Sequence, residues 1–246
     1  MKVILNNPLD QRTKYDGTKY IWNEVYSKVY DFSPRPSDDL KYINNRYQLC
    51  AKLNYNKNES EEMLFSGDII FNFFDSSRRG KRRIYTEMKK ILEKERNEAR
   101  DKSKLDELDY IETLLEDCKK RTESKENVSI LPSTGGLQLV KQAVGRDRFD
   151  TFLWCIDEHY KGNSLLFNHC AAAHIPKLES FLNLFNNVYE FCYCIYNLDC
   201  DDNTLIDSLV ASGRRPINNS SRVFEIVTLA NKFWHRRIEE FQLLKI

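Results

Sequence analysis

The sequence predicts a mainly α-helical fold of the α+β class, with a helical core, a small β element and a charged helical hairpin. Apolar residues recur at helical spacing over most of the chain, which is the primary sequence signal of secondary structure. Only 8 of the 246 residues are glycine, so turns that need a positive φ are few. Hydrophobic residues make up 41% of the chain and aromatic residues 12%, too many for a disordered protein. We expect one domain spanning residues 1–246.

The N-terminal part of the chain predicts two helices followed by a β element. Residues 18–29 place their apolar side chains on one helical face, and a second helix is expected from Ser37, which supplies an N-cap. The region 62–74 is rich in β-branched and aromatic residues. This composition favours a strand or hairpin, with a buried helical turn as the alternative. A second β segment is expected at 127–132.

Residues 78–121 predict a charged helical hairpin. Of these 44 residues, 15 are Lys or Arg and 11 are Asp or Glu, giving a local net charge of +4. Two narrow apolar stripes at helical spacing indicate two helices joined near residues 101–104. We expect the pair either to project from the body or to pack through one face. A charge run of this kind is most often a solvated surface.

The apolar helical core is predicted over residues 145–246. Between residues 149 and 200, eight residues are charged and eleven are aromatic. A helix is expected from Phe149 to Tyr160, followed by helices near 175–185 and 188–198. A long C-terminal helix follows, with residues 219–221 as candidate caps.

Composition also narrows the classes of protein. The seven cysteines are an odd number without a regular framework, which indicates reduced thiols and a cytoplasmic location. The sequence contains no apolar run of about 18 residues, as a membrane span would need, and its start does not read as a signal peptide. Glycine-rich phosphate loops and the Gly-x-Ser-x-Gly nucleophile motif are absent from the sequence.

The order of several motifs resembles an uncharacterised family of bacterial proteins known as a domain of unknown function. Gln142-Ala143-Val144-Gly145 precedes Asp147-Arg148-Phe149-Asp150, the following helix ends in His159-Tyr160, and a Phe-rich helix pair comes after it. The resemblance covers roughly residues 30 to 240. It implies a shared helical fold and a bacterial or phage origin, and it brings no established activity.

A basic cluster is the sharpest local motif. Five of six residues are cations directly before a predicted helix: Arg78, Arg79, Lys81, Arg82 and Arg83. Cations at a helix N-terminus oppose the helix dipole by about 0.3–1 kcal/mol each, so helix stability does not explain the cluster. It is a candidate nucleic-acid or phosphate site. The alternative is a solvated loop or pairing with acidic groups of the same protein.

Arg148, Asp150 and His159 are the candidate catalytic residues. His159 follows near the core-facing edge of the same predicted helix, where a general acid or base is geometrically possible. The alternative is structural. In that case Asp147 or Asp150 caps the helix and Arg148 pairs with a carboxylate. His159 then lies at the edge of the core near the end of the helix, where the helix dipole favours a cation.

The sequence predicts no metal and no cofactor. Three residues at 169, 170 and 174 lie near the cysteines at 192, 194 and 200 in the sequence, namely His169, Cys170 and His174. However, a Cys-x-Cys pair on a helix points to diverging faces, and the sequence has no Cys-x-x-Cys motif. The aspartates at 199, 201 and 202 lack the glycine and glutamate of a calcium loop.

Two functions stay open at this point. The first is a non-catalytic binding or regulatory protein that engages nucleic acid or a partner protein through the basic cluster and the charged hairpin. The alternative is an enzyme that acts on a phosphate-containing or nucleic-acid substrate, with Arg148, Asp150 and His159 at its centre. The sequence does not predict the oligomeric state.

Overall fold

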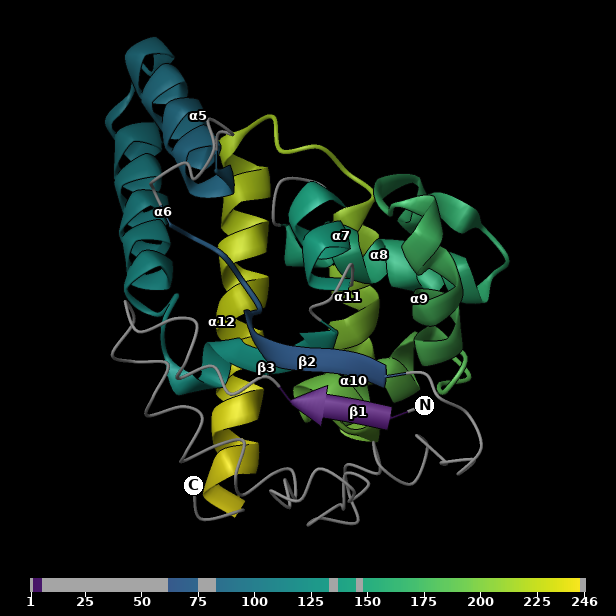
Figure 1. The fold of residues 1–246 in the computed structure, drawn as a ribbon. Coiled ribbons are helices and arrows are strands. Elements are labelled where there is room, and N and C mark those ends of the chain that lie inside the picture. The colour runs from purple at the N-terminus through teal and green to yellow at the C-terminus, as the bar shows by residue number, and fades with distance from the viewer. Residues whose placement is uncertain (1, 6–61, 75–82, 133–136, 145–147, 244–246) are drawn as a thin grey trace.

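The structure is a computed structural model that describes residues 2–5, 62–74, 83–132, 137–144 and 148–243. The helices predicted over residues 18–29 and from Ser37 lie outside this part of the chain. The described residues form a mainly α-helical fold with a small β-sheet, which confirms the predicted fold class (Figure 1). Among the described helices, none combines the length and the apolar character needed to pass through a lipid bilayer.

The sheet has three strands in the order β1-β2-β3. β1 (Lys2–Leu5) runs parallel to β2 (Glu62–Ile69), and β2 pairs antiparallel with β3 (Val128–Pro132). The two predicted β segments are therefore confirmed. The sequence does not predict β1, because four residues are too short to show an alternating pattern and their partner begins only at Glu62.

α5 (Ile84–Glu98) and α6 (Lys102–Lys120) form the predicted hairpin. Asp101 ends the connection between them, and its side chain accepts a hydrogen bond from the Lys104 amide at 2.9 Å. Both helices pack against the long C-terminal helix α12 (Ser220–Leu243) (Figure 1). Of the two predicted arrangements, the hairpin adopts the one that packs through one face.

The remaining helices complete the core, to which the buried faces of α5, α6 and α12 also belong. These remaining helices are α7 (Leu137–Ala143), α8 (Phe149–Tyr160), α9 (Ile175–Leu182), α10 (Val188–Tyr196) and α11 (Asn203–Gly213), with the short 3-10 turns η4 (Lys125–Asn127), η6 (Ser164–His169), η7 (Ala172–His174) and η8 (Cys200–Asp202). α8 has the predicted bounds. Asn219 caps α12 by accepting a hydrogen bond from the Arg222 amide at 2.9 Å.

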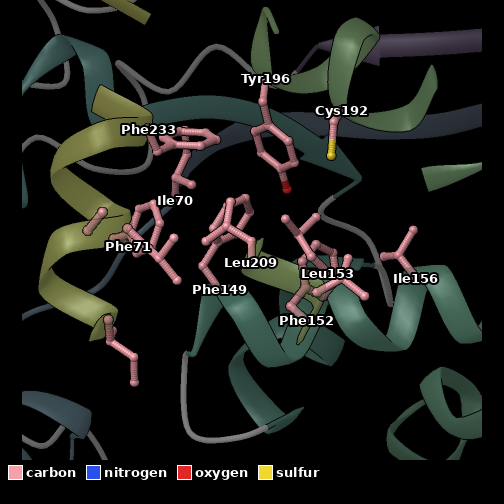
Figure 2. Packing of buried hydrophobic residues seen from close by; sticks show 14 of the residues in the cluster. Ile70, Phe71, Phe149, Phe152, Leu153, Ile156, Cys192, Tyr196, Leu209 and Phe233 are labelled. Atoms are coloured by element: carbon pink, nitrogen blue, oxygen red, sulfur yellow. The ribbon is translucent and has the colours of Figure 1, made fainter. Parts of the chain in front are cut away.

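Aromatic rings from distant parts of the chain meet in the centre of the core (Figure 2). The ring of Phe149 lies 4.8 Å from Phe71, 4.9 Å from Tyr196 and 5.2 Å from Phe233, measured between ring centroids. All three contacts are edge-to-face, an arrangement that adds about 0.5–1.5 kcal/mol per pair beyond burial. The start of α8 is thereby fixed against the segment that follows β2, against α10 and against α12.

One buried amide joins the hairpin to this core. The Asn127 oxygen accepts hydrogen bonds from the Phe71 amide at 2.9 Å and the Trp234 indole at 2.8 Å. Its nitrogen donates to the carbonyls of Phe71 and Thr122, both at 2.8 Å. Because a buried polar group is costly unless it is satisfied, these four bonds fix the end of α6 relative to α12 and to the segment that follows β2.

Candidate functional site

The structure describes the basic cluster only at its last residue. Arg78, Arg79, Lys81 and Arg82 lie outside the described residues. Arg83 is the N-cap residue of α5, and its side chain makes no capping hydrogen bond. The helix predicted to follow the cluster therefore begins at Ile84, while phosphate binding by the cluster stays a prediction.

The positive charge of the hairpin segment comes entirely from this cluster. Residues 83–121 contain eleven Lys or Arg and eleven Asp or Glu, so the α5–α6 hairpin is neutral. The four cations at 78–82 account for the whole excess of +4. The net charge of the described hairpin therefore does not mark it as a nucleic-acid site.

Many charges of the hairpin also pair with one another between α5 and α6. Lys89 Nζ lies 2.9 Å from the Glu112 carboxylate and 2.8 Å from that of Glu116. Arg96 lies 2.6 Å from Glu112 and 2.7 Å from Asp109. Hydrogen bonds from Lys89 and Arg96 lower the pKa of Glu112 below its ordinary value. These charges therefore hold the two helices together.

Arg148 and Asp150 form a buried ion pair at the start of α8. The carboxylate lies 2.6 Å from Arg148 Nη2 and 3.0 Å from Arg148 Nε, and the two side chains are 9% and 3% exposed. Asp150 also accepts hydrogen bonds from the Thr151 amide at 2.9 Å and the Ser212 hydroxyl at 2.7 Å. A carboxylate can accept about four hydrogen bonds, so these four contacts use its full capacity.

The same pair fastens the turn between α11 and α12. Arg148 donates to the Arg215 carbonyl at 2.8 Å, and Arg222 donates to the Ser212 carbonyl at 2.9 Å. At Gly213 a Cβ would lie 2.2 Å from the Asp150 carbonyl oxygen, so α8 and α11 meet at backbone contact. This geometry matches the structural alternative for Arg148, which pairs with a carboxylate.

His159 lies apart from that pair. It follows Asp150 by nine residues on α8, which corresponds to about 14 Å along the helix axis. Its ring lies edge-on to Phe167 and Tyr160, with both centroid distances at 5.3 Å. Burial lowers the pKa of His159, and the charge of Glu179 acts in the opposite direction. The structure therefore does not bring the three candidate catalytic residues together.

The histidines and cysteines considered for a metal do not converge either. Cys192 and Cys194 are buried in the core, and burial raises the pKa of the Cys192 thiol well above its ordinary value. Within the part of the chain that the structure describes, His169, Cys170 and His174 belong to no group of three potential ligands. These residues are thus close in the sequence, but they do not form a group of metal ligands in the described structure.

The acidic cluster after α10 is explained by local contacts. The ligand atoms of Asp199, Cys200 and Asp201 lie within 4.8 Å of one another. Asp199 and Asp202 form a capping box at the start of η8, and Asp202 pairs with Arg236 at 2.6 Å. Since carboxylates stabilise a helix N-terminus, the cluster has a structural role.

A groove that the sequence does not predict runs between α6 and α12. It has a volume of about 560 Å³ and is lined by Tyr110, Leu114, Asp117, Lys120, Arg121, Phe224, Thr228 and Asn231. Tyr110 and Phe224 meet across it with ring centroids 6.3 Å apart, although they are 58% and 39% exposed. The two exposed rings make the groove a candidate interaction surface. The signal in the sequence is weak, because Tyr110 is one aromatic residue on the polar side of α6.

We compared the chain with models of protein families, with curated proteins and with solved structures, and none of them matches.

Proposed function

We propose that the protein is a non-catalytic binding protein of the cytoplasm that engages a partner protein through the groove between α6 and α12. The observation that carries this proposal is the exposed contact of Tyr110 with Phe224. Aromatic residues dominate the energetic centres of protein interfaces because they bury a large area with few rotatable bonds. A pair from two rigid helices offers such a centre already formed.

The charges of the hairpin support a protein partner over a nucleic acid. Residues 83–121 have a net charge of zero, and ion pairs between α5 and α6 use five of their charged residues. The rings of Tyr110 and Phe224 are also tilted by 47° against each other, so they do not form parallel platforms of the kind on which successive bases stack.

The contacts of the candidate catalytic residues support a non-catalytic role. The Asp150 carboxylate is engaged by Arg148, Thr151 and Ser212, and a catalytic group must reach its substrate within hydrogen-bond distance. In the view of Figure 1, α12 lies between the charged hairpin and α8. A single pocket shared by the hairpin and the start of α8 is not supported by this arrangement.

Selection from a displayed library of random peptides, 14 residues in length, against the purified protein tests the proposal. Binding of the selected peptides is then measured by fluorescence anisotropy. Tyr110→Ala combined with Phe224→Ala is expected to weaken binding at least about thirtyfold, which corresponds to about 2 kcal/mol for a central interface residue. Leu139 is 52% exposed on α7, and Leu139→Ala is the matched control that should change the affinity less than twofold.

Two results would overturn the proposal. In the first, the library yields no peptide whose binding depends on Tyr110 and Phe224. In the second, single-stranded RNA or DNA of 12 nucleotides binds and the double variant abolishes that binding, which assigns the groove to nucleic acid. The melting temperatures of all variants are compared first, so that lost binding is not confused with lost folding.

A further inference from the structure

We infer that the segment bound in the groove is an amphipathic helix of about three turns, with a carboxylate in its first turn that pairs with Arg121. This inference rests on the proposed function and names the occupant of the same groove. The inference rests on three observations: what lies on each flank of α6, the length of the groove, and the charge of the groove.

α6 has a helix on one flank and the groove on the other. Its buried stripe consists of Leu108, Ile111, Leu115 and Cys118. With about 3.6 residues per turn, the residues that pair with α5, namely 109, 112 and 116, lie on one side of this stripe. Tyr110, Leu114, Asp117 and Arg121, which line the groove, lie on the other side.

α12, the second wall of the groove, also has α5 on one side and the groove on the other. It runs in the same direction as α6, because Lys104 contacts Ser220 at one end and Cys118 contacts Asn231 at the other. α5 packs against both helices on the occupied flank. A helix in the groove therefore takes the position on the open flank that corresponds to the position of α5.

The length of the groove fits a short helix. Tyr110 and Arg121 are eleven residues apart on α6, which corresponds to about 16 Å or three helical turns. Both walls of the groove are helices, whose backbone groups are already bonded internally. An extended segment would find no strand edge to pair with, whereas an amphipathic helix buries its apolar side in such a groove.

The positive charge of Arg121 at the end of the groove favours an acidic partner. Asp117 pairs with Lys120 at 2.7 Å, while the side chain of Arg121 forms no ion pair within the described residues. The Arg121 guanidinium carbon lies 5.9 Å from the centroid of the Trp234 ring, which orients the group. One uncompensated arginine thus stands at the end of the groove, where a carboxylate can bind it with two hydrogen bonds.

The direction of α5 and the helix dipole together indicate the direction of the bound helix and the position of its acidic residue. α5 runs antiparallel to α6, since Lys89 pairs with Glu116 and Arg96 pairs with Asp109. A bound helix with the same direction as α5 begins beside Arg121. Carboxylates are favoured in the first turn of a helix, so the dipole and Arg121 both place the acidic residue there.

Two synthetic peptides of 12 residues test this inference. Both are acetylated and amidated and share the apolar residues of the peptides selected above. One carries Glu in its first turn and the other carries Glu in its last turn. We expect the first to bind wild-type protein about fivefold more tightly, as an exposed ion pair of about 1 kcal/mol would give. Arg121→Gln should remove the part of this difference that the ion pair supplies and leave only the smaller preference of the helix dipole for a carboxylate in the first turn. Arg100→Gln, which changes an exposed arginine of the hairpin outside the groove, should preserve the full difference.

The outcomes separate the inference from the proposed function. Equal affinity of the two peptides, with binding that still depends on Tyr110 and Phe224, overturns the inference and leaves the function standing. Selected peptides whose apolar residues alternate with a period of two overturn the helical occupant. Selected peptides that bind the Tyr110→Ala, Phe224→Ala variant as tightly as the wild type overturn both the inference and the proposed function. Sedimentation showing a dimer that Phe224→Ala dissociates assigns the groove to a second copy of the chain and also overturns the inference.

Discussion

At the scale of single residues, two buried ion pairs have a structural role, because they join secondary-structure elements. Asp150 is enclosed by Arg148 and two further donors. Lys141 and Asp68 form a second buried pair, which ties the end of β2 to α7, and Lys141 also donates to the Ile69 carbonyl. In both cases a charge that could serve chemistry is used to join secondary-structure elements. Such pairs are costly to break, because one charge is then left buried alone.

Asp150→Ala is expected to lower the free energy of unfolding by about 3–5 kcal/mol, since the variant leaves Arg148 buried without its carboxylate. Urea denaturation followed by circular dichroism measures this quantity. Asp106→Ala removes an exposed aspartate from α6 and should change it by less than about 0.5 kcal/mol. Equal effects of the two substitutions would contradict the structural role of Asp150.

Gly213→Ala tests the backbone contact between α8 and α11. A Cβ at this position would lie 2.2 Å from the Asp150 carbonyl oxygen. The helices must therefore separate, at a cost of about 3 kcal/mol, the upper end of the usual range for overpacking. Gly162 has a φ of +86° and open space around it, so Gly162→Ala should cost about 1 kcal/mol through backbone strain alone. The comparison uses the free energy of unfolding in urea, and a smaller effect at 213 than at 162 would refute the contact.

The pH dependence of stability tests the surroundings of His159. Burial lowers the pKa of His159 in the folded protein below its ordinary value near 6.5, against the opposing charge of Glu179. As the pH falls through this ordinary value, the unfolded state takes up the proton first, so stability is lost below about pH 6.5. The melting temperature should fall less between pH 7.5 and 5.5 in His159→Gln than in the wild type. An identical slope would show that the folded state does not lower this pKa.

At the scale of elements, one carboxylate links all three helices around the hairpin. Glu95 of α5 accepts hydrogen bonds from the amide of Ser220 at 2.7 Å and from its hydroxyl at 2.6 Å, at the start of α12. Lys104 of α6 lies 3.5 Å away. Burial opposes ionisation of Glu95, yet the bonds from Ser220 and Lys104 lower its pKa overall. The start of α12 is therefore capped by a residue from another helix.

A double-mutant cycle of Glu95→Ala and Ser220→Ala should show a coupling free energy of about 1 kcal/mol, the usual contribution of a helix cap. The cycle is measured by urea denaturation. Glu98→Ala with Ser220→Ala is the control cycle, because Glu98 is an exposed glutamate of the same helix, and its coupling should be close to zero. Similar coupling in both cycles would exclude the cap.

The elements that the sequence predicts well are those whose signal is local. The two helices of the hairpin and the bounds of α8 follow from apolar spacing, and the structure confirms them. The connection in the hairpin covers residues 99–101 and so lies slightly before the predicted 101–104, because Asp101 caps α6 and residues 102–104 form its first turn. β1 could not be predicted because its pairing partner lies far along the chain. α7 and α11 have only seven and eleven residues, too few for a clear helical period against a largely apolar background.

At the scale of the whole molecule, the candidate site depends on the position of α12. This helix packs against α5, α6 and α11 and supplies Phe233 and Trp234 to the aromatic core. On its other side it supplies Phe224 to the groove. Sequence reasoning missed the groove because neither Tyr110 nor Phe224 is unusual alone. Only the parallel packing of α6 and α12 brings the two rings together at the surface.

The binding position of a selected peptide tests the central claim most directly. A peptide from the library carries a benzophenone at its central apolar position, is irradiated with the protein, and the adduct is located by mass spectrometry after digestion. The account predicts adducts on Tyr110, Leu114 or Phe224, which line the apolar part of the groove. Adducts confined to Leu139 or Leu243, which are exposed on other elements or at the end of α12, would contradict it.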